Sequence, residues 1–181
     1  MATLLSTMNF DLLTLEQAEK ELIFCDSFSR LPDLLDICCR MEESEWLRLL
    51  GQYWSGFDGI ALHMDDLANS PLGERRGTVR EMMTDEELEA YAALPDVVTI
   101  YRGCYKANKW GLSWSLSRQV AEEFPTLLRY RRDGEQPLLV TAKIMKTDVV
   151  AVKMDRGEQE VIAWRPKHIS TRHLLQPLGS C

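Results

Sequence analysis

The chain has 181 residues, 45% of them hydrophobic, and a formal net charge of −7, which together describe a folded protein of one domain or two small ones and exclude an intrinsically disordered chain. No apolar run approaches the roughly 20 residues that span a bilayer, and residues 1–10 lack the positive flank of a signal peptide, so we expect no membrane segment and no secretion signal. The five cysteines are odd in number and include no Cys-x-x-Cys pair, which favours reduced thiols in a cytoplasm over a disulfide framework or a zinc site.

Residues 1–95 are predicted to be helical. Thr14 and Gln17 have the spacing of a capping box, which opens a first helix that reaches about Phe24. Apolar residues at helical spacing predict further helices within residues 32–39, 46–54 and 60–67. We interpret the aromatic side chains of these segments as core.

The rest of the helical half contains a predicted loop and a predicted helix start. Residues 70–77 are rich in Ser, Pro and Gly and are predicted to form a loop. Thr84 and Glu87 form a second capping box, which opens a helix that ends before Pro95. His63 has no ligand partner at useful spacing and is interpreted as structural, so we expect no metal.

From residue 96 onward the pattern changes to strands. Apolar and polar side chains alternate along residues 98–103, which end with Arg102 beside a glycine. Residues 138–145 and 149–154 are rich in β-branched residues, with a turn between them at residues 146–148. Ser117 is placed to cap a helix that carries apolar residues as far as Leu128 and packs on the sheet. The basic loop at residues 129–134 is interpreted as solvated surface. The fold class is therefore α+β, with a helical region at 1–95 and a β-rich region at 96–181 that are either separate or packed as one domain.

Charge divides the chain at the same place. Residues 1–95 hold 7 Lys and Arg against 19 Asp and Glu, a net charge of −12, whereas residues 96–181 hold 14 against 9, a net charge of +5. One interpretation is two differently solvated surfaces. The other is that the basic half handles an anionic ligand such as a dinucleotide pyrophosphate, and the acidic half does not favour nucleic acid as a partner.

Three short motifs follow one another in the β-rich half. Side chains two residues apart on a strand point the same way, so Ser113 and Ser115 share one face, and so do Glu158 and Glu160 if that segment is extended. The serines also fit a plain structural interpretation, in which they form cross-strand hydrogen bonds without a ligand. The motifs, in chain order, are Tyr101-Arg102-Gly103, Ser113-Trp114-Ser115 and Glu158-Gln159-Glu160.

This order resembles the Arg, Ser-Thr-Ser and Glu-x-Glu motifs of the arginine-serine-glutamate branch of ADP-ribosyltransferases, which includes the cholera-toxin-like and clostridial binary toxins and several bacteriophage enzymes. The resemblance extends to residues 116–124 and 155–162 and covers about the last half of the chain. Trp114 departs from the pattern, because the family usually has threonine there. The resemblance implies an ADP-ribosyltransferase-like mixed β core after the helical region.

The resemblance also implies roles for the motif residues. NAD is a consumed substrate, Glu160 is the indispensable residue at the ribose 2′-hydroxyl, and Glu158 acts on the incoming nucleophile. Arg102 holds an NAD phosphate, and Gly103 allows close backbone approach to the nicotinamide amide. Ser113 orients Glu160, and Ser115 braces the strand.

An aromatic ring usually packs on the nicotinamide in this family, and the candidates here are Trp110, Trp114 and Tyr130. No Gly-x-Gly-x-x-Gly occurs, so a Rossmann site is not supported. Glutamate at position 158 accompanies transfer to arginine in the family, which implies a protein acceptor modified on arginine. The expected protein is a cytoplasmic effector, acting in the host cytoplasm if it is phage-encoded.

Two alternatives remain open from the sequence. One is a related reaction, NAD hydrolysis or ADP-ribosylation of a nucleic acid. The other is a non-enzymatic binding protein that acts through its acidic helical half, with the sheet as a scaffold. The motifs do not determine the oligomeric state.

Overall fold

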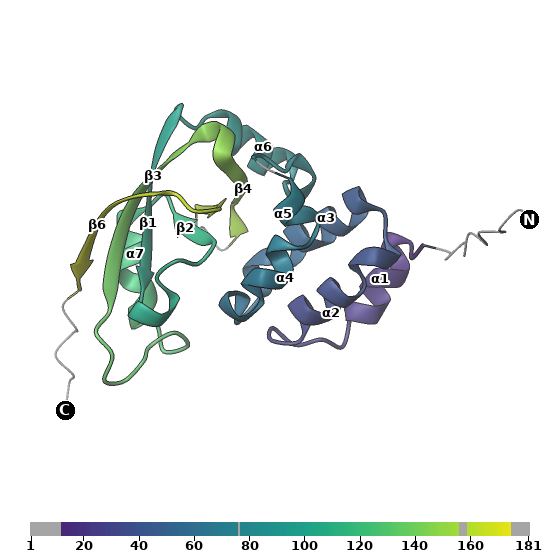
Figure 1. Ribbon diagram of the computed structural model, residues 1–181, viewed down its shortest axis with the longest axis horizontal. Coiled ribbons are helices and arrows are strands. Elements are labelled where there is room, and N and C mark those ends of the chain that lie inside the picture. The colour runs from purple at the N-terminus through teal and green to yellow at the C-terminus, as the bar shows by residue number, and fades with distance from the viewer. Residues whose placement is uncertain (1–11, 76, 156–158, 175–181) are drawn as a thin grey trace, which may run out of the picture.

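Short helices form the first half of the chain, and a sheet with one further helix forms the second (Figure 1). The structure is a computed structural model that describes residues 12–75, 77–155 and 159–174. Its α-helices are α1 (Leu15–Leu22), α2 (Arg30–Asp36), α3 (Glu43–Tyr53), α4 (Met64–Ala68), α5 (Pro71–Glu74), α6 (Asp85–Ala92) and α7 (Arg118–Glu123). Its 3-10 helices are η1 (Cys38–Arg40), η2 (Trp54–Gly56), η3 (Ile60–His63), η4 (Arg80–Met82), η5 (Lys106–Asn108), η6 (Phe124–Thr126) and η7 (Lys146–Asp148).

Both predicted capping boxes are confirmed. Thr14 and Gln17 exchange hydrogen bonds at 2.8 and 3.3 Å at the start of α1, and Thr84 and Glu87 do the same at 2.9 and 3.3 Å at the start of α6. The predicted loop at residues 70–77 is wrong in part, because Ser70 caps α5 by accepting from the Leu72 amide. None of the described helices has both the length and the apolar character needed to cross a membrane.

The six strands form one sheet in the order β4-β5-β2-β1-β3-β6. They are β1 (Val97–Cys104), β2 (Ser113–Ser115), β3 (Leu138–Met145), β4 (Val149–Lys153), β5 (Glu160–Ala163) and β6 (Lys167–His173). Every pairing is antiparallel, so the expected mixed sheet is wrong, while the α+β class is confirmed. Residues 146–148 do form a turn, η7, but β3 and β4 are not neighbours, because β4 pairs with β5 at one edge of the sheet.

Helix α7 begins where the sequence predicted and ends early. Ser117 accepts from the Val120 amide at 3.3 Å and caps the helix. Pro125 lacks an amide hydrogen and lies in η6, which follows α7 directly. Leu128 is 88% exposed, so the expectation that it lies against the sheet is wrong.

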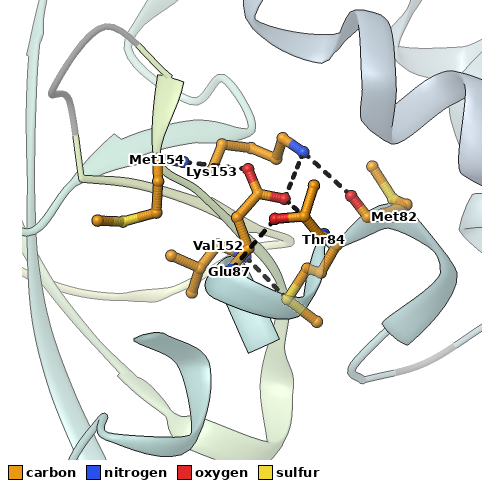
Figure 2. A network of polar contacts seen from close by, with 7 residues as sticks. Met82, Thr84, Glu87, Val152, Lys153 and Met154 are labelled. Atoms are coloured by element: carbon orange, nitrogen blue, oxygen red, sulfur yellow. Dashed lines mark hydrogen bonds and ion pairs between the residues drawn. The ribbon is translucent and has the colours of Figure 1, made fainter. Parts of the chain in front are cut away.

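Helices and sheet share one continuous cluster of buried side chains. A buried ion pair joins them: the Lys153 ammonium on β4 donates to Glu87 of α6 at 2.8 Å and to the Met82 carbonyl at 3.1 Å. Glu87 also accepts from the Met154 amide at 3.1 Å (Figure 2). One carboxylate therefore fixes the start of α6 and the end of β4 together.

Candidate functional site

The three motif segments of the β-rich half become neighbouring strands. Arg102 lies in β1, Ser113 to Ser115 form β2, and Glu160 is the first residue of β5. Strand β2 lies between the other two, with Ser115 opposite Tyr101 on one side and opposite Glu160 on the other. Directly opposed residues project to the same face of a sheet, so these three side chains share a face, as do Ser113 and Ser115. Glu158 lies outside the described residues.

A cavity of about 300 Å³ is lined by residues from all three of these strands. The sheet lines it with the motif residues of β1, β2 and β5. The helical half contributes η2, Phe57 and Ile60, and the opposite wall comes from α7, η6 and the segment through Tyr130. The cavity therefore lies where the helical half, the sheet and the α7 segment meet.

A tryptophan from the helical half holds the Glu160 carboxylate. The indole nitrogen of Trp54 donates to Oε1 of Glu160 at 2.9 Å, across 106 positions of sequence. Trp54 is 1% exposed and packs edge-on against Phe57, so its ring is fixed. Sequence reasoning treated Trp54 as core only. A buried indole N–H usually finds an acceptor, but nothing in the local pattern indicates which one.

The Arg102 guanidinium connects β1 to the chain segment that leads into β2. Its Nε and Nη2 donate to the Asn108 carbonyl at 3.2 Å, and its Nη1 donates to the Ser113 carbonyl. Gly111 leaves room for it, because a side chain there would overlap the guanidinium, with Cζ only 2.7 Å from the added carbon.

The positive charge of Arg102 is only weakly balanced by nearby negative charge. Burial lowers the pKa of its guanidinium, and the opposing effects of Cys104 and Glu160 are smaller. No carboxylate among the described residues forms an ion pair with it, although it remains charged at neutral pH. A desolvated cation in this state favours an anion nearby.

The serines organise the turn from β2 into α7. The Ser115 hydroxyl accepts from the Ser117 amide at 3.0 Å, and Ser117 in turn caps α7. Ser113 lines the cavity, and its carbonyl accepts from Arg102. Among the described contacts, the hydrogen bond to Glu160 comes from Trp54, so the orientation of Glu160 by Ser113 stays a prediction.

Two candidate residues have clear packing roles. A methyl group at Gly103 would overlap the Ala121 carbonyl of α7 and lie 2.6 Å from Pro125 Cδ, so only glycine lets α7 approach β1 this closely. Trp114 is 2% exposed, and its indole donates to the Gly111 carbonyl at 3.0 Å. Their expected contacts with NAD stay predictions.

Of the three candidate aromatic rings, Tyr130 is the one best presented to the cavity. It lines the cavity and stacks on Phe124, with ring centroids 4.2 Å apart and planes 18° apart. The neighbouring Arg129 forms an ion pair with Asp58, which is 9% exposed, so the basic loop is attached to the helical half at its start. Arg129 is nevertheless 47% exposed, and residues 131–134 are exposed too, so the interpretation of this loop as solvated surface is confirmed for all of it but Tyr130. Trp110 lies instead against His168, 5.5 Å away between ring centroids.

Within the described ranges, no group of three or more His, Cys, Asp or Glu side chains is arranged to hold a metal ion. Comparison with models of protein families, with curated proteins and with solved structures finds no match to this chain. Function must therefore be inferred from the residues of the site itself.

Proposed function

We propose that the protein is an NAD-dependent mono-ADP-ribosyltransferase with an ADP-ribosyltransferase-like core, which transfers ADP-ribose to arginine of a target protein and releases nicotinamide. The observation that carries the proposal is the gathering of the three motifs on adjacent strands around one cavity. Arg102 and Ser113 are 11 positions apart and Ser115 and Glu160 are 45 apart, yet all four residues line the same cavity, as the residues of a substrate site must.

The reaction needs a carboxylate at the ribose. The bond between the ribose C1′ and the nicotinamide nitrogen breaks, its electron pair leaves with nicotinamide, and positive charge develops on the ribose. A fixed carboxylate beside the ribose favours this transition state over the ground state, in which the positive charge lies on the nicotinamide ring. Glu160, held by Trp54, takes this role, and it also accepts a hydrogen bond from the ribose 2′-hydroxyl.

Arg102 and Tyr130 supply the binding contacts in this proposal. The cavity is at the small end of the range for ligand sites, so it takes the nicotinamide and its ribose, while the diphosphate and adenosine extend outward. Three of the five guanidinium N–H groups of Arg102 donate to carbonyls, and the remaining two are available for a phosphate oxygen. Tyr130, backed by Phe124, is the surface on which nicotinamide stacks.

The acceptor follows from the glutamate pair. A guanidinium nitrogen attacks C1′ and forms the new N–C bond, and it becomes a competent nucleophile as a carboxylate takes its proton. Glu158 is the proposed base, an assignment that rests on the motif alone. The cysteine content favours a cytoplasmic site of action.

The test is nicotinamide release and label transfer from NAD, with agmatine as a guanidine acceptor. We expect Glu160→Gln to lower both rates by at least about a hundredfold, as loss of a major transition-state contact does. Glu123→Gln is the matched control, since Glu123 is a helix α7 carboxylate bonded to Gln119 outside the cavity lining.

The alternatives give different outcomes in the same assay. Nicotinamide release without transfer to agmatine or protein would identify an NAD glycohydrolase. A wild-type protein that neither binds nor cleaves NAD would refute the enzyme proposal and favour a binding protein.

A further inference from the structure

An exposed apolar patch lies on the helical half. We use this name for the exposed side chains of Ile23 and Phe24, directly after α1, together with Phe28 and Leu62, beside Gly59; Phe24 is 95% exposed and Leu62 is 80% exposed. Leu62 and Phe28 lie side by side, because a methyl group added at Gly59 would be 3.5 Å from the first and 3.7 Å from the second. Grouped exposure of large apolar side chains marks a contact surface, whereas single ones do not.

The patch adjoins the wall of the cavity. Ile60, two residues before Leu62, lines the cavity, and so does Phe57. Between them, Asp58 fixes the turn that carries the two phenylalanines: its amide donates to the Ser27 carbonyl at 2.7 Å, and its carboxylate accepts from the Ser27 hydroxyl at 2.6 Å. A protein bound on Phe28 and Leu62 would thus contact the segment that also lines the cavity.

The surroundings of the patch are acidic. Asp26 lies between the two phenylalanines in sequence and accepts from the Phe28 and Ser29 amides at 2.9 and 2.8 Å, and Asp65 and Asp66 follow Leu62 closely. Arg30, the nearest cation in sequence, is used internally: it donates to the Cys25 carbonyl at 2.6 Å and lies over the Tyr53 ring. Apolar surface with an acidic surround fits a partner that presents apolar and basic side chains together.

We propose that this patch docks the acceptor protein through a segment in which apolar and basic residues flank the arginine to be modified. The inference rests on the proposed function and names the partner chemistry of the same site. It gives the acidic helices a role in catalysis, because docking raises the local concentration of one arginine at the cavity.

The test measures peptide binding separately from catalysis. The probe is a fluorescent synthetic peptide with one arginine flanked by leucines and lysines, and its affinity is measured by anisotropy. We expect Phe24→Ser with Phe28→Ser to weaken binding by about tenfold for each phenylalanine, as loss of a buried aromatic contact does. Ile169→Ser is the matched control, since Ile169 is 49% exposed on β6, and we expect it to bind like the wild type.

A peptide with glutamates in place of the lysines should not bind, and added salt should weaken binding of the basic peptide. Equal affinity of the wild type and the phenylalanine variant, or no saturable binding, would overturn the docking proposal. Wild-type self-association that the phenylalanine substitutions abolish would also overturn it, by assigning the patch to a second copy of this chain.

The transfer reaction with agmatine separates the two proposals. Agmatine has no flanking apolar and basic residues for the patch to bind, so the phenylalanine variant should modify agmatine at the wild-type rate and the peptide more slowly. Failure of the wild type to cleave NAD refutes the proposed function, whereas equal modification of the peptide by both proteins refutes only the docking.

Discussion

Replacing Trp54 by phenylalanine isolates the contact that holds Glu160. The substitution keeps an aromatic ring in the core and removes the indole N–H that donates to Oε1 of Glu160 at 2.9 Å. A hydrogen bond to a charged group contributes about 1.5–3 kcal/mol. If that energy holds the carboxylate in its productive position, the rate of NAD cleavage falls by about tenfold to a hundredfold.

The same substitution also destabilises the fold, so it needs a control of equal structural cost. Trp46 provides it, because it lies eight residues earlier in the same helical segment, is fully buried, and donates its indole N–H to the Leu34 carbonyl at 2.7 Å. We expect each Trp→Phe change to cost about 2 kcal/mol of unfolding free energy, through lost contacts and one lost hydrogen bond. That corresponds to a fall in Tm of about 4–8 °C for a chain of this size.

The assay is single-turnover nicotinamide release at saturating NAD, at a temperature well below both transitions. Trp54→Phe should be slow, and Trp46→Phe should match the wild type once the folded fraction is equal. A wild-type rate for Trp54→Phe would refute the role of Trp54 as the residue that positions Glu160. Equal slowing of both would assign the effect to stability.

Two further predictions concern the framework around the site. Lys153→Met leaves the Glu87 carboxylate buried without its cation, since both side chains are 4% exposed. We expect urea titrations to show a fall in unfolding free energy of about 3–5 kcal/mol. Adding Glu87→Leu should recover part of this loss, and a double variant as unstable as Lys153→Met would contradict the ion-pair explanation. Gly103→Ala forces α7 away from β1 and should lower the unfolding free energy by about 3 kcal/mol or more. Gly134→Ala is the control: its φ is 81°, and no atom lies within 4 Å of the added methyl carbon, so it should lower the unfolding free energy by only about 1–2 kcal/mol through backbone strain. Equal losses for the two variants would refute the packing explanation.

The parts of the fold that the sequence predicted are those with a local cause. Thr14, Thr84 and Ser117 begin helices because each side chain reaches an amide three residues later, and that spacing can be read directly. The strand at residues 97–104 follows from alternation over neighbouring residues. None of these predictions depends on a distant contact.

The arrangement of the strands depends on contacts that the sequence does not encode locally. The segments of β3 and β4 are linked by a tight turn, which suggests a hairpin, yet β4 pairs with β5 at the opposite side of the sheet from β3. The reason lies in the helical half: the Val79 amide donates to the Val150 carbonyl, and Lys153 pairs with Glu87. Strand β4 is thus held against α6 by residues more than 60 positions away.

The candidate site divides in the same way. The three motifs could be picked out from the sequence alone, because they are recognised by the order and spacing of their residues. The donor to Glu160 and the choice of Tyr130 over Trp110 could not, since the first depends on a contact across 106 positions and the second on a stack against Phe124.

The cost of the polar groups at the cavity bears on the choice between an enzyme and a scaffold. A sheet that served only as scaffold would lose little if the partly buried Arg102 and Glu160 were apolar, because replacing desolvated charges by well-packed apolar residues is often neutral or stabilising. Here a desolvated guanidinium forms no ion pair with a described carboxylate, and a buried tryptophan is committed to orienting Glu160. A ligand with an anionic group and a developing cation, as NAD becomes during cleavage, compensates both charges at once. Under the scaffold hypothesis the gain from these two charges, among the described contacts, is limited to the hydrogen bonds of Arg102 to the Asn108 and Ser113 carbonyls and of Trp54 to Glu160.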